Sequence, residues 1–390
     1  MADVLVPRGA SRTLGRVEGD LRVEDAIVKA DSSDNMVHVK GSTLCVGDCS
    51  FNCSLTTTLL EIRDGELVVE GDLEVERVAR ARTGTLLVRG SLCGERLDVD
   101  RRVEVSGDLD SASLDVGGSL MVGGKARVSR LDVGGSVRVD SKIAIGQADV
   151  GGRLSIGGGV IQRSIDVGGV FESSQPVEFA EIRVGGKAQM AGGKGGDIKV
   201  GGSLTSEGDL DFNEVEVDGE VEINGNATGQ SMDVGGAIKV SNNLNLSGSL
   251  DVGGTVEVGG TVRADSIKVG GKIKAERIEA VREIETKMII TRAGAKAEHI
   301  EIGRRDEAEG PIIAEKVLIK ERARVEDVYG REVELRKNCR VRNIYAATLS
   351  IESGCVIAGE VKYIESLKSE PDVTFVYEPE RVKELPRAPV

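Results

Sequence analysis

The sequence predicts an all-β chain that folds as a single-stranded, triangular parallel β-helix, a solenoid of about 17 residues per coil. Two observations lead to this fold class. The phrase Leu-Asp-Val-Gly-Gly at 114–118 returns throughout the middle of the chain with small changes. The apolar residues between these phrases come in pairs separated by one residue, which is the spacing of two inward side chains on a short strand.

The phrase sets a structural period. It occurs at 114–118, 131–135, 148–152 and 165–169, and then decays to variants such as Ile182-Arg-Val-Gly-Gly. From Leu97 onward the first residues of successive phrases lie 16 to 18 residues apart. The same register continues where the glycines thin out, with apolar marks at Ile284, Ile300, Val317, Val333 and Leu349.

One period contains three pairs of apolar residues, which predict three strands. The pairs are Leu114/Val116, Leu120/Val122 and Ala126/Val128. Gly-Gly, Ser-Gly or Asn-Gly follows each strand, and we expect it to supply the positive φ that turns a corner. A coil of this kind cannot bury its own inner face, so successive coils should stack on one continuous apolar core.

The strength of the repeat divides the chain into three parts. Residues 1–60 are expected to be irregular N-terminal coils or a cap, because their apolar pairs are loosely spaced. Residues 61–366 are expected to form one continuous β-helix. Residues 367–390 contain four prolines among charged residues and are expected to leave the solenoid as a tail.

Composition excludes several classes of function. The chain carries 51 basic and 65 acidic residues, a net charge of −14, which opposes binding to nucleic acid. Aromatic residues make up 2%, too few for the stacking platforms of sugar-binding enzymes. No apolar run approaches the roughly 20 residues of a membrane span. Six cysteines in 390 residues do not form a dense disulfide framework, so a cytoplasmic protein with reduced thiols is expected.

The sequence offers no catalytic constellation. The two histidines, His38 and His299, lie about fifteen coils apart in the expected register. The glycine-rich stretch at 192–196 lacks the Lys-Ser/Thr ending of a phosphate-binding loop. We therefore expect a protein that is not an enzyme and uses neither a cofactor nor a nucleotide.

Two sets of residues remain candidates for metal binding. Cys45, Cys49 and Cys53 could supply three thiolates, although core filling is the simpler interpretation of buried cysteines. A ladder of carboxylates recurs at one outward position in five successive coils and could bind divalent cations. Alternatively, each carboxylate accepts a hydrogen bond from the following glycine corner, as in an Asx turn. The ladder consists of Asp98, Asp115, Asp132, Asp149 and Asp166.

The repeating rungs resemble those of the bactofilins, polymer-forming cytoskeletal proteins whose central domain is a right-handed triangular β-helix. The later segment at 317–361, with the pairs Val333/Leu335 and Leu349/Ile351, is also similar to that domain. Bactofilin cores are typically shorter than this solenoid and less regular in their repeat phrase. The resemblance implies a right-handed solenoid and nucleotide-independent assembly into non-polar filaments, in which like ends meet.

The open ends of a β-helix give an independent reason to expect homopolymers, because each end exposes unpaired backbone groups over an apolar core. The alternative is a capped monomer that acts as a binding scaffold or an adhesin-like surface module. Many copies of the apolar stretch Val4-Leu5-Val6 on one filament could also associate with a membrane surface. The residues expected at the polymerisation interface are Leu349, Ile351, Cys355, Ile357 and Val361 at one end, and Leu67, Val69, Leu73 and Val75 at the other.

Overall fold

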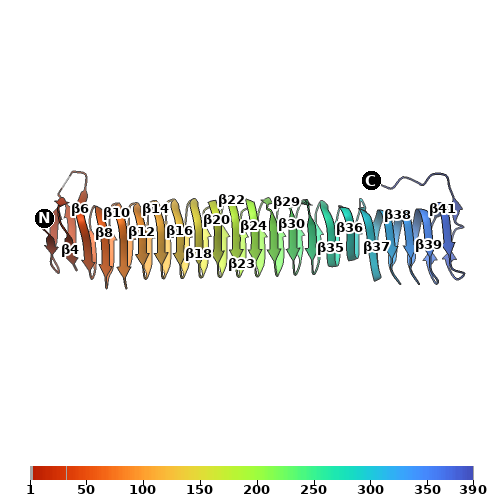
Figure 1. Cartoon of the computed structure of the whole chain (residues 1–390), viewed down its shortest axis with the longest axis horizontal. Helices are drawn as coiled ribbons and strands as arrows, with labels where there is room; N and C mark the ends of the chain where they lie inside the picture. The colour runs from red at the N-terminus through yellow and green to blue at the C-terminus, as the bar shows by residue number, and fades with distance from the viewer. Residues whose placement is uncertain (1–2, 32, 390) are drawn as a thin grey trace. The chain divides into compact units, whose positions relative to one another are not determined.

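The computed structural model describes residues 3–31 and 33–389, which form a parallel β-solenoid of about 22 turns with about 17 residues per coil. This confirms the predicted fold class. Two compact units, Met1–Gly196 and Asp197–Val390, make up the chain. The expectation of one uninterrupted β-helix over residues 61–366 stays a prediction, and each unit by itself is a stack of coils (Figure 1).

Within the first unit, each strand pairs in parallel with the strands of the neighbouring coils, and among the described residues those of the first coil have a partner on one side only. The strands are β1 (Val4–Val6), β2 (Ser11–Leu14), β3 (Arg16–Val17), β4 (Leu21–Glu24), β5 (Ile27–Ala30), β6 (Met36–Val46), β7 (Cys49–Phe51), β8 (Ser54–Arg63), β9 (Glu66–Val69), β10 (Leu73–Arg82), β11 (Thr85–Val88), β12 (Leu92–Val99), β13 (Arg102–Val105), β14 (Leu109–Val116), β15 (Ser119–Val122), β16 (Ala126–Val133), β17 (Ser136–Val139), β18 (Ile143–Val150), β19 (Arg153–Ile156), β20 (Gly159–Val167), β21 (Val170–Ser173), β22 (Val177–Val184) and β23 (Lys187–Met190).

The later strands follow the same scheme, although several of them run around a corner without interruption. They are β24 (Gly193–Val200), β25 (Ser203–Ser206), β26 (Leu210–Asp211), β27 (Glu214–Val217), β28 (Glu220–Ile223), β29 (Ala227–Gly229), β30 (Ser231–Val234), β31 (Ile238–Val240), β32 (Leu244–Leu246), β33 (Ser249–Val252), β34 (Val256–Val258), β35 (Thr261–Ala275), β36 (Arg277–Thr291), β37 (Ala295–Ile319), β38 (Arg324–Leu335), β39 (Arg340–Ile351), β40 (Val356–Ile357), β41 (Val361–Ser369), β42 (Thr374–Phe375) and β43 (Glu380–Arg381).

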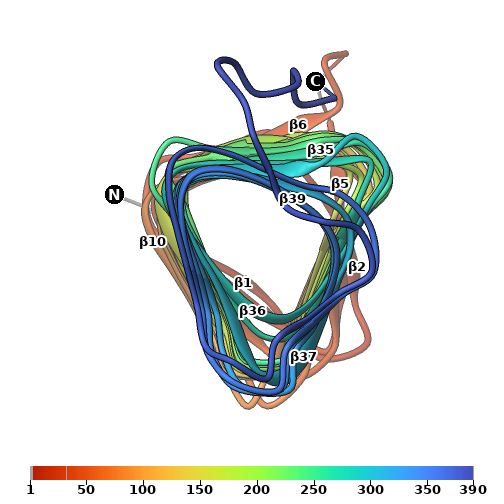
Figure 2. The same ribbon diagram turned by 90° about the vertical axis from the view of Figure 1, so that its right-hand side faces the viewer.

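The coils of either unit trace a three-sided path when viewed along the stack (Figure 2). We name the sides A, B and C in chain order, with side A carrying the Leu-Asp-Val part of the repeat. On side A, Leu114 lies opposite Leu131 of the next coil, and on side B, Leu120 lies opposite Val137. On side C, Leu109 lies opposite Ala126. These residues are at most 3% exposed, so the predicted inward positions are confirmed.

The repeat glycines do not have the conformation expected of them. Positive φ occurs at other glycines, such as Gly47 and Gly354, but not at Gly151 or Gly152 of the Asp-Val-Gly-Gly corner. A Cβ atom on Gly151 would lie 2.3 Å from the carbonyl oxygen of Gly134 in the preceding coil. Close approach between coils, rather than a left-handed backbone, therefore requires glycine at this corner.

Residues 4–31 and 33–57 contain strands that pair with the neighbouring coils. The first coil consists of β1, β2 and β3, and the second of β4, β5 and the beginning of β6. The side A ladder thus runs back to Val4, which lies opposite Leu21. The sequence obscured this register because Leu21 and Thr43, which lie opposite each other, are 22 residues apart instead of about 17.

Candidate functional site

None of the nine residues expected at the polymerisation interface lies in a terminal coil. Leu67 and Val69 belong to β9, which pairs with β7 on one side and β11 on the other. Leu73 and Val75 belong to β10, which pairs with both β8 and β12. Their assignment to an end was wrong, because the coils formed by residues 4–57 stack in front of them.

The expected residues at the other end are also covered. Ser369 lies opposite Ile351, and Phe375 lies opposite Ile357. The Thr374 N–H donates to the Cys355 carbonyl oxygen at 2.9 Å. Leu349, Ile351, Cys355, Ile357 and Val361 are consequently at most 2% exposed. The assignment was wrong because prolines do not end the solenoid: Pro371 and Pro379 lie between strands, and the chain completes another coil.

The last turn consists of residues 366–369 on side A, β42 on side B and β43 on side C, and within the described residues the outer edges of all three are unpaired. The strand β42 pairs with β40 on side B, and β43 pairs with the beginning of β41 on side C. Residues 366–369 of β41, on side A, pair only with β39 among the described residues. The segment after β43 runs outside the three-sided path and not over this edge (Figures 1 and 2). Val376 and Tyr377 beside β42 are 58% and 61% exposed.

The first coil is open on all three sides within the described chain. The strands β1, β2 and β3 pair only with β4, β5 and β6. Arg12 lies opposite the buried Val28 and therefore occupies an inward position. Its Nη1 donates to the Leu5 carbonyl oxygen at 2.9 Å. A charged side chain at an inward edge position is a known means of discouraging uncontrolled edge pairing.

An arginine also covers a backbone carbonyl at the last coil. Arg381 lies opposite Tyr363, and its Nε donates to the carbonyl oxygen of Ile364 at 3.0 Å. Both terminal coils thus combine unpaired strand edges with one arginine that satisfies a backbone acceptor. The edges can accept another strand, and the arginines make that step weaker than ordinary stacking between coils.

The apolar N-terminal stretch is part of the first coil. Val4, Leu5 and Val6 make up β1, and the Val6 side chain is fully buried in the core. Leu5 points outward and is 50% exposed. The described residues contain no helix that is long and apolar enough to cross a membrane.

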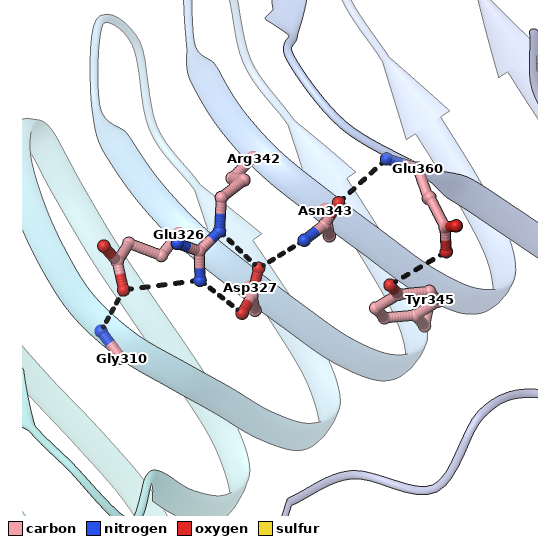
Figure 3. A network of polar contacts seen from close by, with 7 residues as sticks. All are labelled: Gly310, Glu326, Asp327, Arg342, Asn343, Tyr345 and Glu360. Carbon is pink, nitrogen blue, oxygen red and sulfur yellow. Dashed lines mark hydrogen bonds and ion pairs between the residues drawn. The ribbon is translucent and has the colours of Figure 1, made fainter. Parts of the chain in front are cut away.

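A polar network joins four coils near the last coil (Figure 3). Arg342 donates from Nε and Nη2 to the two carboxylate oxygens of Asp327, at 2.9 and 2.6 Å. The Asn343 Nδ2 donates to the same carboxylate at 2.8 Å, and the Asn343 Oδ1 accepts the Glu360 N–H at 2.8 Å. The Arg342 guanidinium holds the pKa of Asp327 below its ordinary value. The network therefore ties neighbouring coils together through charge-assisted hydrogen bonds.

A tyrosine pair lies beside this network. The rings of Tyr329 and Tyr345 stack one coil apart, with centroids separated by 4.8 Å. The Tyr345 hydroxyl donates to the Glu360 carboxylate at 3.2 Å. Removal from water raises the pKa of Tyr345 to about 12, so the phenol stays protonated and can donate. Each contact described here joins one coil to its neighbour.

The candidate cysteines lie in the core. Cys45, Cys49 and Cys53 are buried, and the Cys49 thiol donates to the Val23 carbonyl oxygen at 3.5 Å. Burial raises the pKa of Cys53 to about 11, which disfavours the thiolate that a metal requires. Over residues 3–31 and 33–389, no three His, Cys, Asp or Glu side chains are placed to hold a metal ion. Cys339 and Cys355 are buried one coil apart, as their spacing predicted.

The carboxylate ladder has the predicted register but not the predicted hydrogen bonds. Asp98, Asp115, Asp132, Asp149 and Asp166 lie opposite one another in successive coils. The ladder is bounded by Arg80 before Asp98 and by Arg183 after Asp166. The Asx-turn interpretation is wrong at these corners, because the glycine amides donate to the preceding coil. For example, the Gly151 N–H donates to the Val133 carbonyl oxygen at 2.9 Å.

Repulsion within the ladder should cost stability. Loss of water and the neighbouring charges of Asp132 and Asp98 raise the pKa of Asp115. We expect Asp115→Asn to raise the free energy of unfolding at pH 7 by about 0.2–1 kcal/mol, the range for like charges on adjacent strands. Because a raised pKa favours the protonated carboxyl in the folded state, this gain should vanish as the pH falls below about 4. Chemical denaturation at pH 7 and at pH 3 measures it.

Asp140→Asn is the matched control. Asp140 lies 2.7 Å from the Arg138 Nε, so its replacement removes an attractive partner and should bring no gain. Equal stability changes in the two variants would contradict an electrostatic cost of the ladder.

The histidines are not brought together. His38 lies in the first unit opposite Arg16 and Thr56, and its side chain is exposed. His299 lies in the second unit opposite Glu283 and is half-buried. Comparisons of the chain with protein-family models, with curated proteins and with solved structures gave no match.

Proposed function

We propose that the chain is a non-enzymatic structural protein that assembles end to end through its terminal coils, without nucleotide or metal. The observation that carries this proposal is the unpaired edges: β1, β2 and β3 in the first coil, and residues 366–369 in the last, within the described chain. Such edges are templates for pairing with another strand. The resemblance of the rungs to bactofilins supports a cytoskeletal filament as the product.

Electron microscopy of the purified chain tests this proposal. We expect negatively stained filaments that lengthen with protein concentration and persist in a chelator and without nucleotide. Their persistence follows from assembly by strand pairing and apolar stacking alone. Filaments that dissolve when a chelator is added would contradict the proposed mechanism.

A capped monomer is the second candidate, and the arginine contacts favour it. Arg12 and Arg381 each satisfy a backbone carbonyl in a terminal coil, which lowers the tendency of these coils to pair. Such a monomer would serve as a scaffold with long regular faces. Sedimentation equilibrium distinguishes the candidates, because a monomer mass that does not change with concentration would support the scaffold.

A further inference from the structure

The side on which the chain begins is the side that would follow the end of the last coil in the order A, B, C. The last strands of the chain are β42 on side B and β43 on side C, so the next side in chain order is side A, where residues 366–369 have an unpaired outer edge within the described chain. The first coil begins with β1 on side A, followed by β2 on side B and β3 on side C. If a second copy were stacked on the last coil, its β1 would therefore supply the next strand on side A.

We propose that copies of this chain join head to tail, with β1 of one copy adding in parallel to residues 366–369 of the other. This inference rests on the proposed end-to-end assembly and specifies its polarity. The partner is a second copy of the chain. The contact is heterologous, so repeated addition gives an open, polar filament. The bactofilin resemblance implies the opposite arrangement, in which like ends meet.

The backbone groups at the two edges are complementary. The Val4 N–H donates to the Asp20 carbonyl oxygen of the next coil. The inward residues of β1 therefore direct their backbone N–H and carbonyl groups toward the second coil. In a parallel ladder the intervening residue, Leu5, then directs its N–H and carbonyl toward the open side. By the same alternation Ser369 directs its N–H outward. On docking, the Ser369 N–H would replace Arg12 as the donor to the Leu5 carbonyl.

Side chains match when the ladders are extended across the junction. On side A, Leu349 lies opposite Leu367, so the next inward residue in that ladder would be Val4 of the second copy. On side B, Tyr377 follows Phe375 by two residues, just beyond the end of β42, and its side chain is largely exposed. Release from Leu5 would place the Arg12 guanidinium beside an exposed aromatic ring, which favours a cation–π contact.

The outward charges on side C also match. Lys362 lies opposite Glu380 in the last coil. In the first coil the corresponding outward residue is Arg16, which lies opposite His38. Extension of the ladder gives alternating charges, with Glu380 between Lys362 and Arg16 of the second copy. The inward arginines still oppose burial, so this junction should be weaker than stacking within the chain, and assembly should depend on concentration.

Proline substitutions at the two open edges test the polarity. Leu5→Pro and Ser369→Pro each remove an N–H that faces the open side, a position at which an edge strand tolerates proline. In a head-to-tail contact, either variant alone should stay monomeric, whereas their equimolar mixture should form a one-to-one dimer. Sedimentation velocity reads out the masses, and unchanged circular dichroism and thermal unfolding establish that each variant is folded.

Like-end contact gives the opposite result. Each proline variant alone would then dimerise through its unmodified end, and the mixture would form no mixed pair. That outcome would overturn the polarity while leaving end-to-end assembly intact. A chain without substitutions that stays monomeric at every concentration would overturn the proposed function and this inference with it.

A charge exchange provides a second test that does not alter the backbone. Arg16→Glu and Glu380→Arg should each raise the concentration needed for assembly about two- to fivefold, as expected for an exposed ion pair. The double variant should return it to within about twofold of the original, because the pair is restored with reversed signs. A double variant that assembles no better than either single variant would contradict contact between Glu380 and Arg16.

Discussion

Replacing Gly151 by alanine is expected to lower the free energy of unfolding by about 1–3 kcal/mol, the usual cost of overpacking a well-packed site. The new Cβ would lie 2.3 Å from the Gly134 carbonyl oxygen, and this contact involves rigid backbone. The Gly151 amide is tied to the Val133 carbonyl at 2.9 Å, so the corner cannot move away without weakening a bond between coils. Chemical denaturation of the purified variant measures the change.

Gly94→Ala is the control for this experiment. At Gly94 the nearest atom to an added Cβ is the Val75 carbonyl oxygen at 3.4 Å, which is an ordinary contact. This substitution should be neutral, or stabilise by about 0.4–1 kcal/mol through the lower entropy of the unfolded chain. Equal losses in the two variants would show that glycine at the corner serves flexibility rather than space.

The core of the solenoid could be predicted from sequence because its signal is repetitive and local. The spacing from Leu97 onward indicated the inward residues, and Leu114 opposite Leu131 has the expected register. The reason for the glycines could not be read in the same way. Both a positive φ and a close carbonyl select glycine, and only the distance from Gly151 to the Gly134 oxygen distinguishes them.

At the C-terminal end of the solenoid, composition and register point to different structures. Prolines at 371 and 379 suggested a departing tail, yet proline is compatible with the corners between short strands. Phe375 lies opposite Ile357 and continues the side B ladder. This spacing of 18 residues is within the range of the repeat, so the sequence contained the signal.

Polar residues at another corner also form hydrogen bonds between coils. Asp72 and Asp108, each directly before an inward leucine, accept the N–H groups of Ser91 and Lys125 at 2.7 Å from the following coil. Asn243 accepts the Thr261 N–H at 2.9 Å in the same way. Asp or Asn before an inward residue on side C was a recurring signal that could have predicted these bonds. Pairing of Arg342 with Asp327 depends on side-chain conformation and had no such signal.

Asp327→Asn is expected to lower the free energy of unfolding at pH 7 by about 1.5–3 kcal/mol, the range for hydrogen bonds to charged groups. The Asp327 side chain is 17% exposed, and its carboxylate accepts both guanidinium bonds of Arg342 and one from Asn343. Its pKa is lowered from 3.8 by these partners. The stabilisation is therefore present above about pH 4 and is lost as the pH falls through the lowered value.

Denaturation curves at pH 7 and near pH 2 should show a large difference between Asp327→Asn and the original chain at the higher pH and a smaller one at the lower. Glu307→Gln supplies the comparison, because Glu307 pairs with Arg324 at 3.2 Å and the two side chains, 36% and 66% exposed, are more open to water than Asp327. Its loss should cost at most about 1 kcal/mol. If both variants lost the same stability, the difference in exposure would not determine how much each ion pair contributes to the free energy of unfolding. Loss of Asp327 would then act through local packing rather than through the charge that joins the last coils.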